Sequence, residues 1–131
     1  MASSRISTLR PVYAEWAKGN FAAGQDLYAP DLVHTGFVPD GRVTTHGLDE
    51  FMRWVSEFFS QWDAYRVEAD EFTALGDDAV LVAGRQYATG KQSGIEVEAP
   101  VFNVWVFSGD RVTGLHFDVD RERVLEAAGR C

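Results

Sequence analysis

The chain has 131 residues and a formal net charge of −8, from 20 acidic and 12 basic residues. This length suits one hydrophobic core, so we expect a single domain over residues 1–131. The basic residues are scattered rather than clustered, which argues against a nucleic-acid-binding face. The N-terminus lacks the apolar run of a signal peptide, and no segment approaches the roughly 18 consecutive apolar residues of a membrane span. We therefore expect a cytoplasmic protein that contacts neither nucleic acid nor membrane.

Cysteine and histidine are too sparse for a metal centre. The single cysteine, Cys131, cannot form a disulfide within the chain, which suits a reducing cytosol. The three histidines, His34, His46 and His116, have no paired ligand spacing. Neither a Gly-rich phosphate loop nor a nucleophile elbow occurs. We expect no metal and no cofactor.

The first thirty residues predict a helical hairpin. Ser7 or Thr8 is suited to cap a first helix that has Pro11 in its opening turn, where a missing N–H costs little. Asn20 is suited to cap a second, shorter helix. That helix is expected to end before Pro30, because proline disfavours helical backbone in the residue that precedes it.

The next segment predicts a short strand pair and the strongest helix. A strand is expected at 32–37, a turn at 38–41 because Pro39 and Gly41 favour one, and a return strand at 42–45. Apolar residues recur at helical spacing over 48–61. This segment should be a helix with one buried face.

The second half of the chain changes to period two, which predicts strands joined by short turns. Short connections force antiparallel neighbours, and the apolar face of the sheet needs helices to cover it. The expected fold class is α+β: a cone-shaped roll in which a curved antiparallel sheet with strands of mixed length wraps around three helices from the N-terminal half. The strands are expected at 64–75, 79–89, 95–107 and 111–119, followed by a short C-terminal helix at 120–129.

Four local patterns and the order of elements resemble the superfamily of nuclear transport factor two, and within it the SnoaL-like polyketide cyclases and the ketosteroid isomerases. The likeness covers nearly the whole chain, and each pattern marks the fold rather than a catalytic motif. A shared fold hosts unrelated chemistries. The patterns are Trp16-Ala17-Lys18-Gly19-Asn20, Tyr28-Ala29-Pro30-Asp31, Gly76-Asp77-Asp78-Ala79-Val80 and the run from Asp120 to Gly129.

The resemblance to the isomerases implies three positions. Their tyrosine on the first helix falls on Val12, with Tyr13 beside it on a different face. Their base falls near Thr35 or Gly36, and neither residue is an acid. Their acid on the penultimate strand falls on Asn103, whose amide can still donate to a carbonyl. Without a base or a tyrosine at these positions, the isomerase mechanism is not supported.

The resemblance to the limonene epoxide hydrolases implies an arginine flanked by two carboxylates. The arginine position matches Arg85, whereas one carboxylate position falls on Tyr87. The other, which is also the aspartate position of the SnoaL cyclases, falls on Phe117. His116 and Asp118 lie one residue to either side, so in a regular strand both point away from the cavity, and only a bulge brings them in.

These positions define a candidate site. His34 shares strand parity with the isomerase base position and is the best candidate for proton transfer near neutral pH, although a lone half-buried histidine is more often structural. Asn103, Arg85 and Tyr87 complete the candidate catalytic set, and for Arg85 a cross-strand ion pair with Glu96 or Glu98 is equally expected. The expected apolar lining is Tyr13, Trp16, Trp54, Phe58, Trp105, Leu115 and Phe117.

Two functions follow from the resemblance and from this site. The first is a small-molecule pocket protein that catalyses cofactor-free proton transfer on a small, apolar, carbonyl-bearing compound, as an isomerase or cyclase does. The second is a non-catalytic protein of the same fold that binds an apolar ligand or serves as a dimerising scaffold. With either function, we expect a homodimer that forms through the sheet face. The absence of acids at the family positions favours the second.

Overall fold

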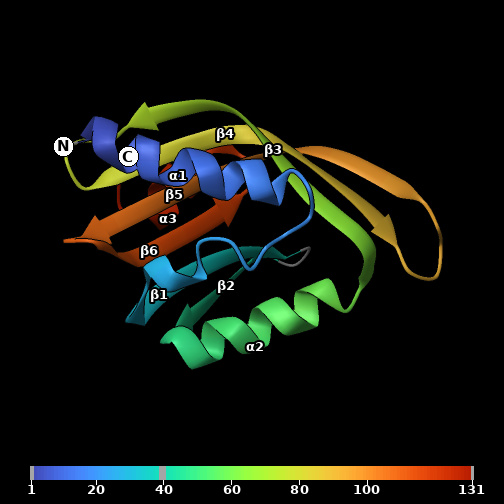
Figure 1. Cartoon of the computed structure of the whole chain (residues 1–131). Coiled ribbons are helices and arrows are strands. Elements are labelled where there is room, and N and C mark those ends of the chain that lie inside the picture. The colour runs from blue at the N-terminus through green and yellow to red at the C-terminus, as the bar shows by residue number, and fades with distance from the viewer. Residues whose placement is uncertain (1, 39–40, 131) are drawn as a thin grey trace.

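The computed structural model describes residues 2–38 and 41–130. For most of the chain, helices and strands follow one another in the order predicted from the spacing of the apolar residues (Figure 1). The elements are α1 (Ala2–Trp16), the 3₁₀ helix η1 (Gln25–Leu27), β1 (Tyr28–Val38), β2 (Gly41–His46), α2 (Leu48–Phe59), β3 (Trp62–Ala74), β4 (Ala79–Gly90), β5 (Glu96–Ser108), β6 (Arg111–Asp118) and α3 (Arg121–Ala127).

The six strands form one curved sheet in the order β2-β1-β6-β5-β4-β3. All neighbours are antiparallel except β1 and β6, which run parallel and bring the two ends of the chain's strand series side by side. The predicted α+β roll is confirmed, with this parallel pair making the sheet mixed. The β4–β5 hairpin is long and extends past both α1 and α2 (Figure 1).

The helices cover the two faces of the sheet unequally. Residues of α1 and α2, among them Leu9 and Phe51, pack in one cluster with the inward side chains of the sheet, which we call the inner face. Val124 of α3 packs with Leu81 and Val104 on the opposite, outer face. No helix within residues 2–38 and 41–130 has the length and hydropathy to cross a membrane.

The first helix begins earlier than predicted. It starts at Ala2, and Pro11 lies in its interior instead of its first turn. The Thr8 hydroxyl donates to the carbonyl of Ser4 at 3.0 Å, which is a bond from within a helix rather than a cap. Arg5 holds the early turns by donating to the carbonyls of Asp77 and Gly109. The predicted cap at Ser7 or Thr8 is therefore wrong.

The predicted second helix is also wrong. Residues 17–24 form turns, and η1 is the only helical element between the end of α1 and the start of β1 at Tyr28. Gly19 and Gly24 have φ of 86° and 91°, outside the right-handed helical region, so a continuous helix cannot run through them. The Asn20 side chain donates to Glu15 instead of capping a helix.

The remaining predicted elements are confirmed within a few residues. The pairing of Val38 with Gly41 closes the β1–β2 hairpin, while Pro39 and Asp40 of the predicted turn lie outside the described residues. Asp120 caps α3, because its carboxylate accepts from the backbone N–H of Arg123 at 3.0 Å.

The β5–β6 hairpin fixes which side chains face inward. Asn103 pairs with Phe117 and Trp105 with Leu115, so all four lie on the inner face. The register shifts by one where Val106 pairs with Gly114 and Phe107 with Val112, which leaves Thr113 without a partner. Thr113 is thus the extra residue of a β-bulge.

Candidate functional site

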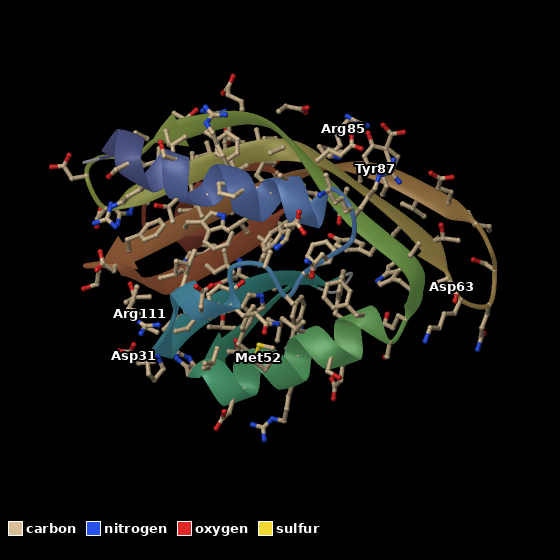
Figure 2. The ribbon with its side chains drawn as sticks, viewed as in Figure 1. Asp31, Met52, Asp63, Arg85, Tyr87 and Arg111 are labelled. Carbon is tan, nitrogen blue, oxygen red and sulfur yellow. The ribbon has the colours of Figure 1, made fainter. Side chains whose placement is uncertain are left out.

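A cavity of about 610 Å³ lies between α2, the segment that follows α1 and the inner face of β3, β4 and β5. Its wall is largely apolar, and Met52 points into it from α2 (Figure 2). The volume falls within the roughly 300–1,000 Å³ of small-molecule sites. The aromatic residues that line it are Trp16, Phe21, Tyr28, Phe51, Trp54, Phe58, Phe59, Trp62, Tyr65 and Phe117.

Helix α2 builds one wall through its spacing. Phe51, Trp54, Val55 and Phe58 recur three or four residues apart and so share one face of the helix. The rings of Trp54 and Phe58 stack with centroids 5.3 Å apart, and Phe58 meets Tyr65 of β3 edge-on at 5.2 Å. The aromatic side chains therefore brace one another around the open space.

The predicted lining divides into two groups. Trp16, Trp54, Phe58 and Phe117 line the cavity as expected. The other three lie behind it in the packed core, where they have almost no exposed surface, and the expectation that they line the cavity is wrong. These are Tyr13, Trp105 and Leu115.

Tyr13 is the centre of a buried hydrogen-bonded network. Its hydroxyl donates to Oδ1 of Asn103 at 2.5 Å and accepts from Nε1 of Trp105 at 2.8 Å. Burial raises the pKa of the Tyr13 phenol well above its ordinary value, so the group remains a donor. The tyrosine of α1 thus contacts Asn103, whereas the sequence analysis placed Tyr13 on a different helix face from the expected tyrosine position, Val12.

One end of the network is unsatisfied. Within residues 2–38 and 41–130, Nδ2 of Asn103 is buried and has no hydrogen-bond partner. Asn103 does not itself line the cavity, but its cross-strand partner Phe117 does. An unpaired buried amide donor costs about 1 to 3 kcal/mol, so this atom is a candidate for a polar ligand group.

His34 is fully buried behind the aromatic wall. Its Nδ1 lies 3.1 Å from the Thr45 hydroxyl, and its ring packs on Phe51, Trp54 and Phe117. Burial, and to a lesser extent nearby His116, lowers the pKa of His34 to about 3. The imidazole is therefore neutral at pH 7 and a weak base, and Nε2 has no partner among the described residues.

Arg85 and Tyr87 lie on the outer face, away from the cavity. Nε of Arg85 donates to Glu98 at 2.7 Å, and the Tyr87 ring lies under the guanidinium of Arg66 at 4.0 Å. Figure 2 shows both on the side of the molecule farthest from α2. Their predicted place in the catalytic set is wrong, and the cross-strand pair with Glu98 is the observed arrangement, because odd-numbered residues in this part of β4 face outward.

His116 and Asp118 are buried, and the His116 ring is on the outer face. Nδ1 of His116 lies 2.9 Å from the Thr35 hydroxyl, and burial lowers its pKa to about 4, with Arg42 contributing. Asp118 borders the cavity, but its carboxylate accepts from the backbone amides of Val119 and Asp120 and lies 3.5 Å from Arg123. The bulge at Thr113 precedes these residues and does not turn the His116 ring inward.

The sequence analysis missed polar side chains that line the cavity, among them Trp62, Tyr65 and Gln86. The Tyr65 hydroxyl donates to Oε1 of Gln86 at 2.7 Å, and Nε1 of Trp62 is buried without a partner among the described residues. The signal was present in the alternation of β4: the parity that sends Arg85 outward sends Gln86 inward. Arg85 and Tyr87, the β4 residues whose types suggested catalysis, lie instead on the outer face.

A family model described as a SnoaL-like domain matches residues 9–115. No protein with a curated description matches the sequence. Among solved structures, an NTF2-like protein of unknown function from Burkholderia pseudomallei K96243 is 21% identical, with a TM-score of 0.73, covering 92% of this chain and 94% of that one. These likenesses establish the shared fold.

Two further solved structures have the same fold. A protein proposed to be a SnoaL-like polyketide cyclase from Jannaschia sp. CCS1 is 15% identical with a TM-score of 0.75, covering 96% of this chain and 92% of that one. A protein with a ketosteroid isomerase-like fold from Catenulispora acidiphila DSM 44928, in complex with trimethylamine, is 18% identical with a TM-score of 0.69, covering 95% and 91%.

Proposed function

Because the chain belongs to the SnoaL-like family, we propose that it binds a small, neutral ring compound in the cavity beneath α2. The observation that carries the proposal is an open space of about 610 Å³ with a mainly aromatic and aliphatic wall. Burying a ring system against such a wall provides affinity without any cofactor.

The charges around the cavity favour a neutral ligand over an anion. The acidic residues Glu57 and Asp118 border it, whereas none of the described residues that line it is Lys, Arg or His. An anion placed there would lose hydration without gaining a cationic partner. The net charge of −8 disfavours anions further.

Titration with N-phenyl-1-naphthylamine, a neutral probe that fluoresces in apolar surroundings, tests the proposal. We expect saturable binding of one probe per chain. Ala99→Trp should abolish it, because Ala99 is half-buried in the cavity wall and an indole there fills the space. Ala64→Trp is the matched control, since Ala64 is exposed on β3 and does not line the cavity. Absence of saturable binding, or equal binding by both variants, would refute the proposal.

A second candidate is cofactor-free proton transfer on an apolar carbonyl compound. Two buried groups without partners, Nε2 of His34 and Nδ2 of Asn103, favour it, since both belong to inner-face residues that adjoin Phe117. His34 would act as acid or base and Asn103 would donate to the developing enolate. The pKa of His34, at about 3, weighs against this candidate and makes binding the better-supported function.

Hydrogen–deuterium exchange at the α-carbon of 2-acetylnaphthalene in D₂O, followed by NMR, tests the second candidate. We expect catalysed exchange that His34→Ala abolishes while the fold persists by circular dichroism. Exchange at the same rate in His34→Ala would remove His34 from the mechanism. Association of two copies through the outer sheet face stays a prediction, which light scattering tests.

A further inference from the structure

A pair of polar side chains, Tyr65 and Gln86, lies in the largely apolar wall of the cavity. They belong to neighbouring strands, β3 and β4, and both face inward beside the aromatic residues of α2. They are separate from the buried network of Tyr13, which lies behind the wall. Polar groups in an apolar site commonly set the orientation of the ligand.

The hydrogen bond between them fixes the orientation of the Gln86 amide. The Tyr65 hydroxyl donates to Oε1, and burial raises the pKa of that phenol, so it stays protonated and continues to donate. With Oε1 engaged, the amide presents Nε2 and its two N–H groups on the other side. No described residue accepts from Nε2.

Trp62 supplies an independent observation at the same end of the cavity. It lies three residues before Tyr65, lines the cavity, and packs on the same Phe58 ring as Tyr65, at 6.2 Å compared with 5.2 Å. Its indole Nε1 is buried and has no partner among the described residues. Buried indole N–H groups usually find an acceptor, so this one is available to a ligand.

We propose that Gln86 and Trp62 form a polar subsite that binds an uncharged carbonyl oxygen of the ligand, with Tyr65 as the positioning residue for the Gln86 amide. This inference rests on the proposed function of the cavity. The available hydrogen-bonding groups of Gln86 and Trp62 are donors, which match a carbonyl oxygen. The same subsite lacks a cation, so it selects a ketone, quinone or amide over a carboxylate.

The test compares two probes of nearly the same shape, 2-acetylnaphthalene and 2-isopropylnaphthalene. The first carries a carbonyl oxygen where the second carries a methyl group. Dissociation constants are measured by displacement of N-phenyl-1-naphthylamine. Gln86→Leu should weaken binding of the ketone about five- to tenfold and leave binding of the hydrocarbon unchanged or tighter. Gln92→Leu makes the same substitution in the exposed β4–β5 turn and should change neither.

Two more variants separate the roles within the subsite. Trp62→Phe removes the indole N–H and should weaken the ketone about two- to fivefold relative to the hydrocarbon. Tyr65→Phe frees the Gln86 amide to rotate. It should reduce the preference for the ketone over the hydrocarbon by less than Gln86→Leu does. Unchanged ratios in Trp62→Phe or Tyr65→Phe would remove the corresponding residue from the subsite. If Gln86→Leu does not fold, Gln86→Met takes its place.

The outcomes distinguish this inference from the proposed function. If the unaltered protein binds neither naphthalene, the proposed function fails and the subsite fails with it. If both compounds bind and Gln86→Leu leaves their ratio unchanged, the subsite is refuted while ligand binding stands. A selective loss of the ketone supports both.

Discussion

The inner face of the sheet has two halves that the same strands build differently. In the half under α1, which we call the closed half, Tyr13, Trp105 and Leu115 pack with almost no exposed surface. In the half under α2, the hollow half, Trp54 and Phe58 surround the cavity and remain partly exposed. Aromatic residues therefore pack the core in the closed half and line the cavity in the hollow half, although their spacing along strands and helices is similar.

The Tyr13 hydroxyl and the Gln86 amide follow the same division. The Tyr13 hydroxyl has both a donor and an acceptor partner inside the protein, so its bonds stabilise the fold. Gln86 lines the cavity and uses Oε1 of its amide on Tyr65, while Nε2 has no acceptor among the described residues. The comparison teaches that the number of unused hydrogen bonds, rather than residue type, marks the groups available to a ligand.

Truncating one tryptophan in each half gives the largest expected difference. Trp105→Ala should lower the free energy of unfolding by about 4 kcal/mol, because it opens a cavity in packed surroundings. Trp54→Ala should cost about 1 to 2 kcal/mol, because that side chain already borders open space. Urea denaturation followed by circular dichroism measures both. Equal losses would show that the halves are packed alike.

Removing one tyrosine hydroxyl in each half should give a smaller contrast. Tyr13→Phe leaves Oδ1 of Asn103 and Nε1 of Trp105 buried without a partner, at a cost of about 3 kcal/mol. Tyr65→Phe breaks one bond beside the cavity and should cost about 1 kcal/mol. The same denaturation experiment reports both values. A Tyr65→Phe loss as large as that of Tyr13→Phe would contradict the division.

The pH dependence of stability probes the two buried histidines. Their folded pKa values, about 3 for His34 and about 4 for His116, lie below the unfolded value near 6.5, so the unfolded chain binds more protons between those limits. The stabilisation is complete above pH 6.5 and falls as the pH is lowered toward the folded values. From pH 7 to pH 5 we expect a loss of about 2 kcal/mol for each histidine.

Single substitutions separate the two contributions. His116→Gln should remove its share of the slope, since His116 is enclosed on the outer face. His34 lies against the cavity wall, so water in the cavity that reaches Nε2 would shrink its share. An undiminished share for His34 would place it with the closed half.

The sequence predicted most of the fold because its strongest signals are local. Period-two strands and the apolar stripe of α2 are consequences of burial on one side, and they survive in the structure. The prediction of a second helix was wrong because Gly24, at φ of 91°, interrupts a segment whose composition suits a helix. The predicted start of α1 was wrong because the Thr8 hydroxyl bonds to a carbonyl within the helix. Residue propensities do not distinguish such a bond from a helix cap.

The candidate site was harder to predict than the fold. The family resemblance placed Asn103 and Phe117 correctly on the inner face, but it cannot distinguish the packed core from the cavity wall. That difference depends on where α1 and α2 lie over the sheet, which is a tertiary property. Arg85 was assigned inward through a family likeness, whereas its own strand alternation sends it outward to Glu98.

The bulge at Thr113 has a consequence for comparing this chain with shorter or longer relatives. Since Thr113 is the one residue of β6 that the ladder with β5 does not use, a chain without it keeps Val112 and Leu115 on the inner face. A gap placed two residues later, at Leu115, instead aligns Gly114, which faces outward, with the residue of the relative that faces inward. Sequence alignments in this region therefore need their gap at position 113, because moving it by a residue or two assigns the packed inner-face position of Leu115 to the wrong side chain.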